Sequence, residues 1–153
     1  MPTLPYDRNT KEFLAYIGSR GIVRLEVGIR WRAEDRAGRE VAMEFSQDLI
    51  KGTVVPMVLK LVSEQERYGY EIIRVVNERT DNAFAWKEGT LYPWLHRLEG
   101  EGLIQSRWVE TEAGRQRKYY RLTRRGAAAL RERTAEWTTF AKAVNVVLLA
   151  APA

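Results

Sequence analysis

Residues 88–123, EGTLYPWLHRLEGEGLIQSRWVETEAGRQRKYYRLT, decide the fold. The first part of this stretch has an apolar residue every three or four positions, at Leu91, Leu95 and Leu98. This spacing predicts a helix over Glu88–Glu101, and Gly102 is a natural stop. After Gly102 the period becomes two, and one strand face holds Ile104, Ser106 and Trp108. Residues 111–116 include a glycine and predict a turn, so Lys118–Leu122 is the returning strand of a hairpin.

Two further helices are expected before this stretch. From Asp48 onward, apolar residues follow helical spacing at Leu49, Ile50, Val54, Met57, Val58, Leu61 and Val62. Proline is tolerated in a first helical turn, so Pro56 places the start of the regular helix near Thr53. The next helix is predicted over Tyr70–Arg79. Three helices followed by a hairpin are the order of a winged helix, whose third helix can enter a DNA major groove while the hairpin reaches phosphates.

A long last helix is expected after the hairpin. Thr123 can cap it, and it is predicted to end near Leu149. Its seam has spacings that alternate between three and four, at Ala127, Leu130, Thr134, Trp137, Ala141, Val144 and Leu148. A helix of about 26 residues is roughly 39 Å long, which is more than a small domain covers. We therefore favour a homodimer over packing within one domain, with dimer contacts through Leu130, Trp137, Val144 and Leu148.

Residues 1–46 are interpreted as an N-terminal arm that stabilises the dimer. A short amphipathic helix is expected over Thr10–Ile17. Apolar and charged residues alternate over Val23–Trp31, which favours a half-buried strand, although Ile22, Leu25 and Ile29 also fit a helix face. The predicted organisation is this arm, a winged-helix domain over residues 47–123 and a dimerisation helix over residues 124–149. The fold class is mainly α with a small β-hairpin.

The composition excludes several classes of protein. Hydrophobic residues make up 45% and charged residues 29% of the 153 residues, which is typical of one globular domain. The absence of cysteine and the single histidine exclude disulfides and a multi-histidine metal site within one chain. No phosphate-binding glycine loop or nucleophile motif is present, so we expect no enzyme, no cofactor and no metal. The polar N-terminus and the short uncharged stretch Ala143–Ala153 predict a cytoplasmic protein that does not enter a membrane.

The positive charge is concentrated in the second part of the chain. The formal net charge is +5, and residues 1–48 contribute none of it, since eight basic side chains there balance eight acidic ones. Residues 113–125 contain no acidic residue and six basic ones: Arg115, Arg117, Lys118, Arg121, Arg124 and Arg125. Such a cluster is either a solvated basic loop or an element that contacts phosphates.

Several segments resemble the signature segments of PadR-family transcriptional regulators. They are LIKGT at 49–53, YGYEII at 68–73, EGTLYP at 88–93, LHRLE at 95–99 with EGLI at 101–104, and RKYYRLT at 117–123. The resemblance covers about residues 49–149 and implies a homodimeric winged-helix DNA binder. Such proteins are usually repressors, and many respond to a small aromatic or lipophilic effector. Pro56 is unusual in the first helix, and the arm is longer than in minimal members.

The expected DNA-binding residues are Tyr70, Lys87, Glu88, Gly89, Thr90, Tyr92, Pro93, His96, Arg97, Arg115, Arg117 and Lys118. Tyr70 can donate to a phosphate or pack against the third helix. The start of the third helix offers backbone N–H groups to a phosphate, although Glu88 can instead be a simple first-turn acid. Tyr92 lies off the leucine stripe, and the resemblance also implies that it faces DNA. His96 is more often an ordinary surface residue than a sensor.

An effector site is expected at Trp137, between the short residues Thr134 and Ala141. Two indoles that face each other across a two-fold axis can sandwich a planar aromatic molecule. The resemblance supports this, because family members that bind planar drugs have an aromatic residue at this point. The alternative is that Trp137 fills the seam and leaves no cavity. The alternative function is a winged-helix protein-interaction module without an effector, which needs no basic hairpin.

Overall fold

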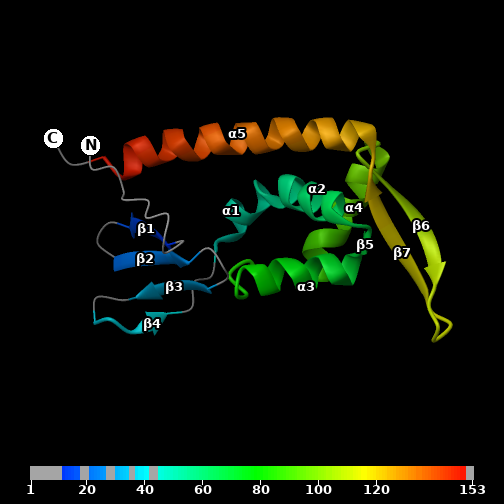
Figure 1. Ribbon diagram of the computed structural model, residues 1–153, viewed down its shortest axis with the longest axis horizontal. Helices are drawn as coiled ribbons and strands as arrows, with labels where there is room; N and C mark the ends of the chain where they lie inside the picture. Colours follow the sequence, from blue (N-terminus) through cyan, green and yellow to red (C-terminus); the bar gives the residue numbers. More distant parts are fainter. Residues whose placement is uncertain (1–11, 18–20, 27–29, 35–36, 42–44, 151–153) are drawn as a thin grey trace.

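The computed structural model describes residues 12–17, 21–26, 30–34, 37–41 and 45–150 (Figure 1). Its helices are α1 (Gln47–Lys51), α2 (Val54–Glu64), α3 (Gly69–Arg79), α4 (Glu88–Gly100) and α5 (Arg124–Leu148). A three-stranded antiparallel sheet has the order β5-β7-β6 and consists of β5 (Arg67–Tyr68), β6 (Ile104–Glu110) and β7 (Gln116–Leu122). The structure confirms the mainly helical class and the predicted order of three helices, hairpin and long helix.

The helix boundaries follow the local signals. Thr53 precedes α2 and Pro56 lies in its first turn, where the lack of an N–H group breaks no helical hydrogen bond. Gly102 has a φ of +72°, the left-handed conformation that ends α4. The Thr123 hydroxyl accepts a hydrogen bond of 3.0 Å from the Gly126 N–H group and so caps α5 as predicted. The two-residue strand β5 was not predicted.

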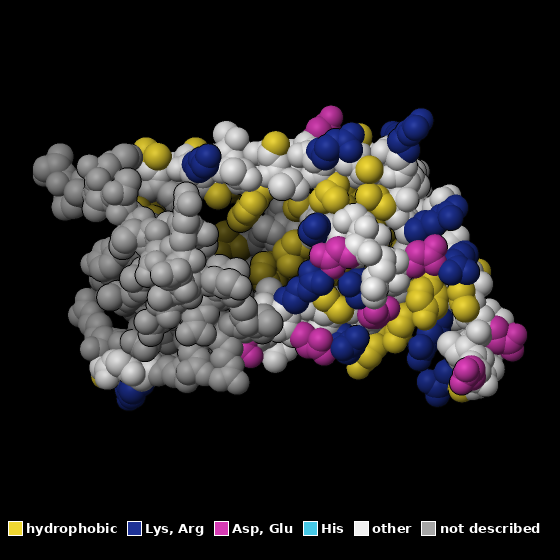
Figure 2. All heavy atoms as spheres, in the orientation of Figure 1, with side chains coloured by type: hydrophobic (Ala, Val, Ile, Leu, Met, Phe, Trp, Pro, Cys, Tyr) yellow, Lys and Arg dark blue, Asp and Glu magenta, His cyan; other side chains and the backbone are white. Residues whose placement is uncertain are grey.

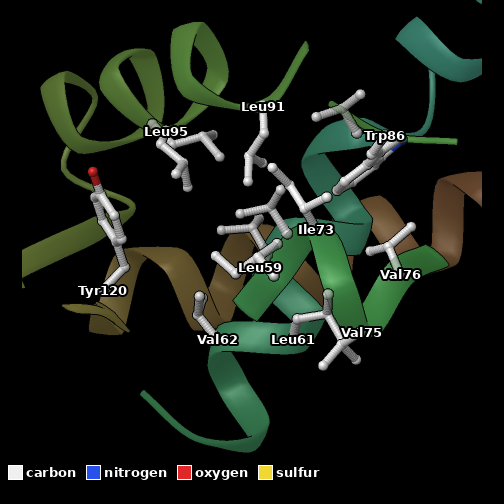
Figure 3. Packing of buried hydrophobic residues seen from close by; sticks show 14 of the residues in the cluster. Leu59, Leu61, Val62, Ile73, Val75, Val76, Trp86, Leu91, Leu95 and Tyr120 are labelled. Atoms are coloured by element: carbon white, nitrogen blue, oxygen red, sulfur yellow. The ribbon is translucent and has the colours of Figure 1, made fainter. Parts of the chain in front are cut away.

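The hydrophobic core lies between α2, α3, α4 and the base of the hairpin. Figure 3 shows Leu91 and Leu95 reaching from α4 towards Ile73 and Leu59. The side chains with no exposed surface are Val54, Val58, Leu59, Ile72, Leu91 and Leu95. Since burying one such side chain contributes about 1.5–3 kcal/mol, this core fixes how α4 lies on α2 and α3.

The N-terminal region forms a four-stranded antiparallel meander, in the order β1-β2-β3-β4, at the end of the molecule opposite the hairpin (Figure 1). Its strands are β1 (Glu12–Ile17), β2 (Gly21–Glu26), β3 (Arg30–Glu34) and β4 (Glu40–Val41). The helix expected over Thr10–Ile17 is therefore wrong from Glu12 onward, and residues 10–11 lie outside the described residues. The pairing of β1 with β2 overrides a short local helical pattern.

The alternating segment Val23–Trp31 is two strands rather than one. Val23–Glu26 belongs to β2 and Arg30–Trp31 to β3, while residues 27–29 lie outside the described residues. The alternation of apolar and charged residues therefore predicted strands correctly, and the helical alternative is excluded at Ile22 and Leu25, which lie in β2. None of the helices in the described part of the chain has the length and apolarity to cross a membrane.

Candidate nucleic-acid interface

The solvent-facing side of α4 carries most of the predicted site. Lys87, Glu88 and Gly89 are exposed at its first turn, and Thr90 is half-buried. Further along the helix, the exposed residues are Tyr92, Pro93, His96 and Arg97. The helix begins after Lys87 without a capping side chain, so N–H groups of its first turn remain available to an anion. A Cβ atom at Gly89 would have no atom within 4 Å, so the surface there is open.

The start of α3 lies directly against this helix. A Cβ atom at Gly69 would come within 2.8 Å of the Tyr92 hydroxyl oxygen, so any other residue here would displace the Tyr92 ring from its present position. Burial raises the pKa of Tyr92, and the negative charge of Glu88 raises it further. The phenol is therefore a protonated donor at neutral pH, while 44% of the Tyr92 residue surface remains exposed. Tyr70, which follows Gly69, is also exposed.

A cluster of aromatic rings joins the start of α3 to the hairpin. The ring of Tyr68 lies 6.5 Å from that of Tyr70 and 5.4 Å from that of Tyr119. The Arg117 guanidinium lies 4.4 Å from the centroid of the Tyr68 ring, within cation–π distance. Tyr70 and Arg117 thus both lie beside the ring of Tyr68. Tyr68 and Tyr119 were not singled out, although both stand in the segments that carry the family resemblance.

Lys118 points back towards α4 instead of towards the hairpin tip. Its ammonium group lies 3.1 Å from one carboxylate oxygen of Glu99. The other oxygen of that carboxylate accepts a hydrogen bond of 2.6 Å from the Ser106 hydroxyl. The Ser106 hydrogen bond and the Lys118 charge lower the pKa of Glu99, and the bond to Glu99 raises that of Lys118. Lys118 therefore fastens the hairpin to α4, and its charge is already partly neutralised.

The hairpin tip is less basic than the sequence alone suggests. Arg115 is exposed in the turn, but the exposed Glu110 and Glu112 stand close to it along the chain. Figure 2 shows acidic side chains (magenta) at the far end of the hairpin beside basic ones (dark blue). Within the described residues, Arg115 and Lys87 have no ion-pair partner. Arg97 is paired with Glu101 at 2.9 Å.

A buried arginine supports the start of α3. Only 6% of Arg67 is exposed, and its guanidinium donates hydrogen bonds to the Leu61 carbonyl (3.2 Å), Glu71 (3.1 Å) and Glu64 (3.3 Å). Arg79 also binds Glu64 at 2.7 Å and is the main cause of the lowered pKa of that carboxyl. These bonds hold α2, β5 and α3 together below Tyr70. The sequence shows the charges but no pattern that identifies their partners.

The residues of the predicted effector site lie on α5, far from this surface along the chain. Thr134 and Trp137 are exposed and Ala141 is half-buried. The Trp137 ring lies 6.1 Å from that of Phe140, which is also exposed. One chain therefore offers two neighbouring aromatic rings at this position, and both are exposed.

Comparisons with known proteins match the winged-helix part of the chain. The model of the PadR-like transcriptional regulator family matches residues 58–132. An uncharacterised protein of Lysinibacillus sphaericus is 38% identical over 101 residues, which are 66% of this chain and 93% of that protein. The crystal structure of a PadR-like transcriptional regulator from Bacillus cereus superposes with a TM-score of 0.60 at 31% identity, over 69% of this chain and 100% of that one. A PadR family transcriptional regulator from Eggerthella lenta gives a TM-score of 0.58 at 36% identity, over 66% and 86% of the two chains.

Proposed function

This chain belongs to the PadR-like family of transcriptional regulators, which bind DNA and are not enzymes, and we propose that it is a sequence-specific repressor released by a small aromatic or lipophilic effector. The observation that carries the proposal of DNA binding is the exposed first turn of α4, which no side chain caps.

The residues divide by what their side chains are free to do. Lys87, the first N–H groups of α4, Tyr70 and Arg115 are free to contact phosphates. Tyr92, Pro93, His96 and Arg97 are exposed along α4 and Thr90 is half-buried, which supports the proposal that these residues approach base edges in a major groove. Arg117 and Lys118 are held by Tyr68 and Glu99, so they fix the hairpin and add positive charge near the backbone of the DNA.

A homodimer supplies the two copies of α4 that a palindromic operator requires. We propose that α5 forms it through Leu130, Trp137, Val144 and Leu148. In one chain, 47% of Trp137 and 72% of Leu148 are exposed, which is unfavourable unless another surface covers them.

We also propose that the N-terminal arm stabilises this dimer. The strand register places Phe13, Leu25 and Trp31 in one row across the sheet, and Ala15, Val23, Ala33 and Val41 in the next row on the same face. Because both rows consist of apolar residue types, we expect this sheet to pack against another surface, and the apolar end of α5 is one. Deletion of residues 1–46 should therefore weaken dimerisation, and a deletion variant with an unchanged dimer dissociation constant would contradict the role.

The effector is proposed to bind between the two copies of Trp137, beside Thr134 and Ala141. A ligand wedged there changes the spacing of the two α4 helices, so that they no longer match half-sites one helical turn apart. By linkage, operator DNA must weaken ligand binding by the same factor.

The decisive experiment is a genome-wide footprint of the protein, followed by titration of the recovered operator at several salt concentrations. If each subunit neutralises about three to five phosphates, log K should fall against log salt with a slope of roughly −5 to −9. The Arg115→Ala variant should weaken all sequences alike, while Thr90→Ala should weaken the operator more than random DNA. No footprint and no salt dependence would favour the protein-interaction module instead.

A further inference from the structure

The connection between α3 and α4 contains three residues with left-handed backbone conformations. Asp81, Asn82 and Ala85 have φ values of 47°, 61° and 47°. Asparagine and aspartate adopt this conformation readily, but it is unfavourable for alanine. A residue such as Ala85 stays in it only where its surroundings hold it there.

Two contacts hold the chain on either side of Ala85. The Asn77 side chain binds the backbone of Trp86 on both sides: its amide group donates to the carbonyl oxygen at 3.0 Å, and its oxygen accepts from the N–H group at 2.8 Å. Trp86 is 3% exposed, yet its indole N–H group has no partner within the described residues. The indole is therefore held by packing alone, immediately before Lys87 and the first turn of α4.

The other contact comes from the N-terminal side of the chain. The Phe45 N–H group donates a hydrogen bond of 3.1 Å to the Ala83 carbonyl oxygen. Its ring meets that of Phe84 at 5.0 Å and 66°, and the Phe84 ring meets that of Trp86 at 6.3 Å and 87°. These edge-to-face contacts form one continuous path from Phe45, two residues before α1, to Trp86, two residues before the DNA-facing helix α4.

Phe45 lies outside the residues that the family model matches. The family model covers residues 58–132, which include Asn77 and Trp86 but not Phe45. The solved relatives are matched over 86–100% of their own lengths while covering only about two thirds of this chain. The path therefore connects Phe45, which precedes the residues matched by the family model, to Trp86 within them.

We propose that Phe45 is a positioning residue for DNA reading: it holds the strained connection at Ala85, so that α4 meets the base edges at a fixed angle. The N-terminal region thereby sets sequence selectivity without touching DNA. This inference rests on the proposed function of α4. Tyr70 and Arg115 lie outside the connection that Phe45 holds, so loss of its ring should leave these contacts with phosphates intact and weaken the reading of bases more than binding to phosphates.

The test compares operator DNA with random DNA. The operator is selected from a random duplex library with the unaltered protein. Phe45→Ala should lower the ratio of operator affinity to random-sequence affinity about tenfold, the effect of one lost base contact, and should change random-sequence affinity less than about twofold. Phe45→Tyr keeps the ring and should restore the ratio. Leu49→Ala is the matched control, because Leu49 is an apolar side chain of the adjacent α1 that is 65% exposed.

Hydrogen exchange provides the second measurement. Phe45→Ala should speed exchange of the amides of residues 81–90, while the core amides of α2 keep their rates. An unchanged affinity ratio in a folded Phe45→Ala protein would overturn the proposal, as would equal losses on both DNAs. If Phe45→Ala does not fold, Phe84→Leu interrupts the same path and is judged by the same two measurements. If the unaltered protein selects no sequence at all, the proposed function itself fails, and this inference with it.

Discussion

The two parts of α5 carry the same amphipathic pattern in opposite surroundings. Over residues 126–130 the helix lies on its own domain: Gly126 is buried, and Ala129 and Leu130 pack against the core. From Arg131 to Ala150 every residue is exposed except Ala141 and Val144, which are half-buried. The first part is thus largely covered within one chain, although Leu130 at its end is half-buried and keeps some surface for a partner, whereas the second part needs another surface.

The largest effect on stability is expected from adding a methyl group at Gly126, in the first part of α5. A Cβ atom at Gly126 would clash with the Leu103 carbonyl oxygen and lie 2.8 Å from a methyl carbon of Leu122. Since the clash is with backbone, Gly126→Ala should lower the free energy of unfolding by about 3 kcal/mol, measured by urea denaturation. Alanine in place of glycine usually stabilises a helix, so the expected sign is reversed here.

Gly89→Ala is the control for this variant. Gly89 also lies in the first turn of a helix, but a Cβ atom there meets no atom within 4 Å. It should therefore stabilise the protein or leave its stability unchanged. Equal unfolding free energies for the two variants would show that the start of α5 does not pack on Leu103 and Leu122 as described.

The next effect concerns the second part of α5. Val144→Asp places a charge in the proposed dimer seam, and burial of an unpaired carboxylate should weaken dimerisation by several kcal/mol. Asn145→Asp adds the same charge at the neighbouring exposed position and should leave the dimer intact. Sedimentation velocity at micromolar concentration distinguishes them. If both variants stay dimeric, the seam is not formed by Val144.

The same contrast explains which parts of the fold were predictable from sequence. In α2, α3, α4 and the hairpin, the spacing of apolar residues is visible within a short stretch of sequence. Gly102 marks the end of α4, and Thr123 marks the end of the hairpin and the start of α5. The strand β1 was mistaken for a helix because its structure depends on pairing with β2, which a short window does not reveal. The strand β5 was missed for a similar reason, since its two residues pair with Tyr119 and Tyr120, about fifty residues later.

Within the candidate site, the sequence predicted which residues face solvent, but it did not predict which side chains form ion pairs and hydrogen bonds with one another. The exposed face of α4 follows from the leucine stripe, because residues off the stripe must face solvent. The ion pair of Lys118 with Glu99 and the three hydrogen bonds of the Arg67 guanidinium depend on how separate elements pack together. The ring contacts that lead from Phe45 to Trp86 likewise arise from tertiary packing, and no spacing of residues in the sequence indicates them.

A smaller effect is expected at the proposed effector site in the second part of α5. Trp137→Ala removes one stacking surface per subunit, and each stacking contact contributes about 0.5–1.5 kcal/mol beyond area burial. Fluorescence titration with a panel of planar aromatics, with and without operator, measures the affinity. Trp108→Ala is the matched control, because that indole is 66% exposed on the hairpin. Binding that survives Trp137→Ala, or that operator DNA leaves unchanged, would exclude the site as the switch.

The smallest effect returns to the start of α5. The Thr123 hydroxyl accepts from the Gly126 N–H group and approaches the carbonyl oxygens of Gly102 (2.6 Å) and Leu103 (3.0 Å). Thr123→Ala removes this cap and should cost about 1 kcal/mol of unfolding free energy, whereas Thr123→Ser keeps the hydroxyl and should cost less. Because this end of the helix is largely covered within one chain, neither variant should change the dimer dissociation constant measured by sedimentation. A Thr123→Ala protein whose dimer dissociates more readily would show that the two parts of α5 are energetically coupled. The two parts would then differ in exposure but would not be independent in stability.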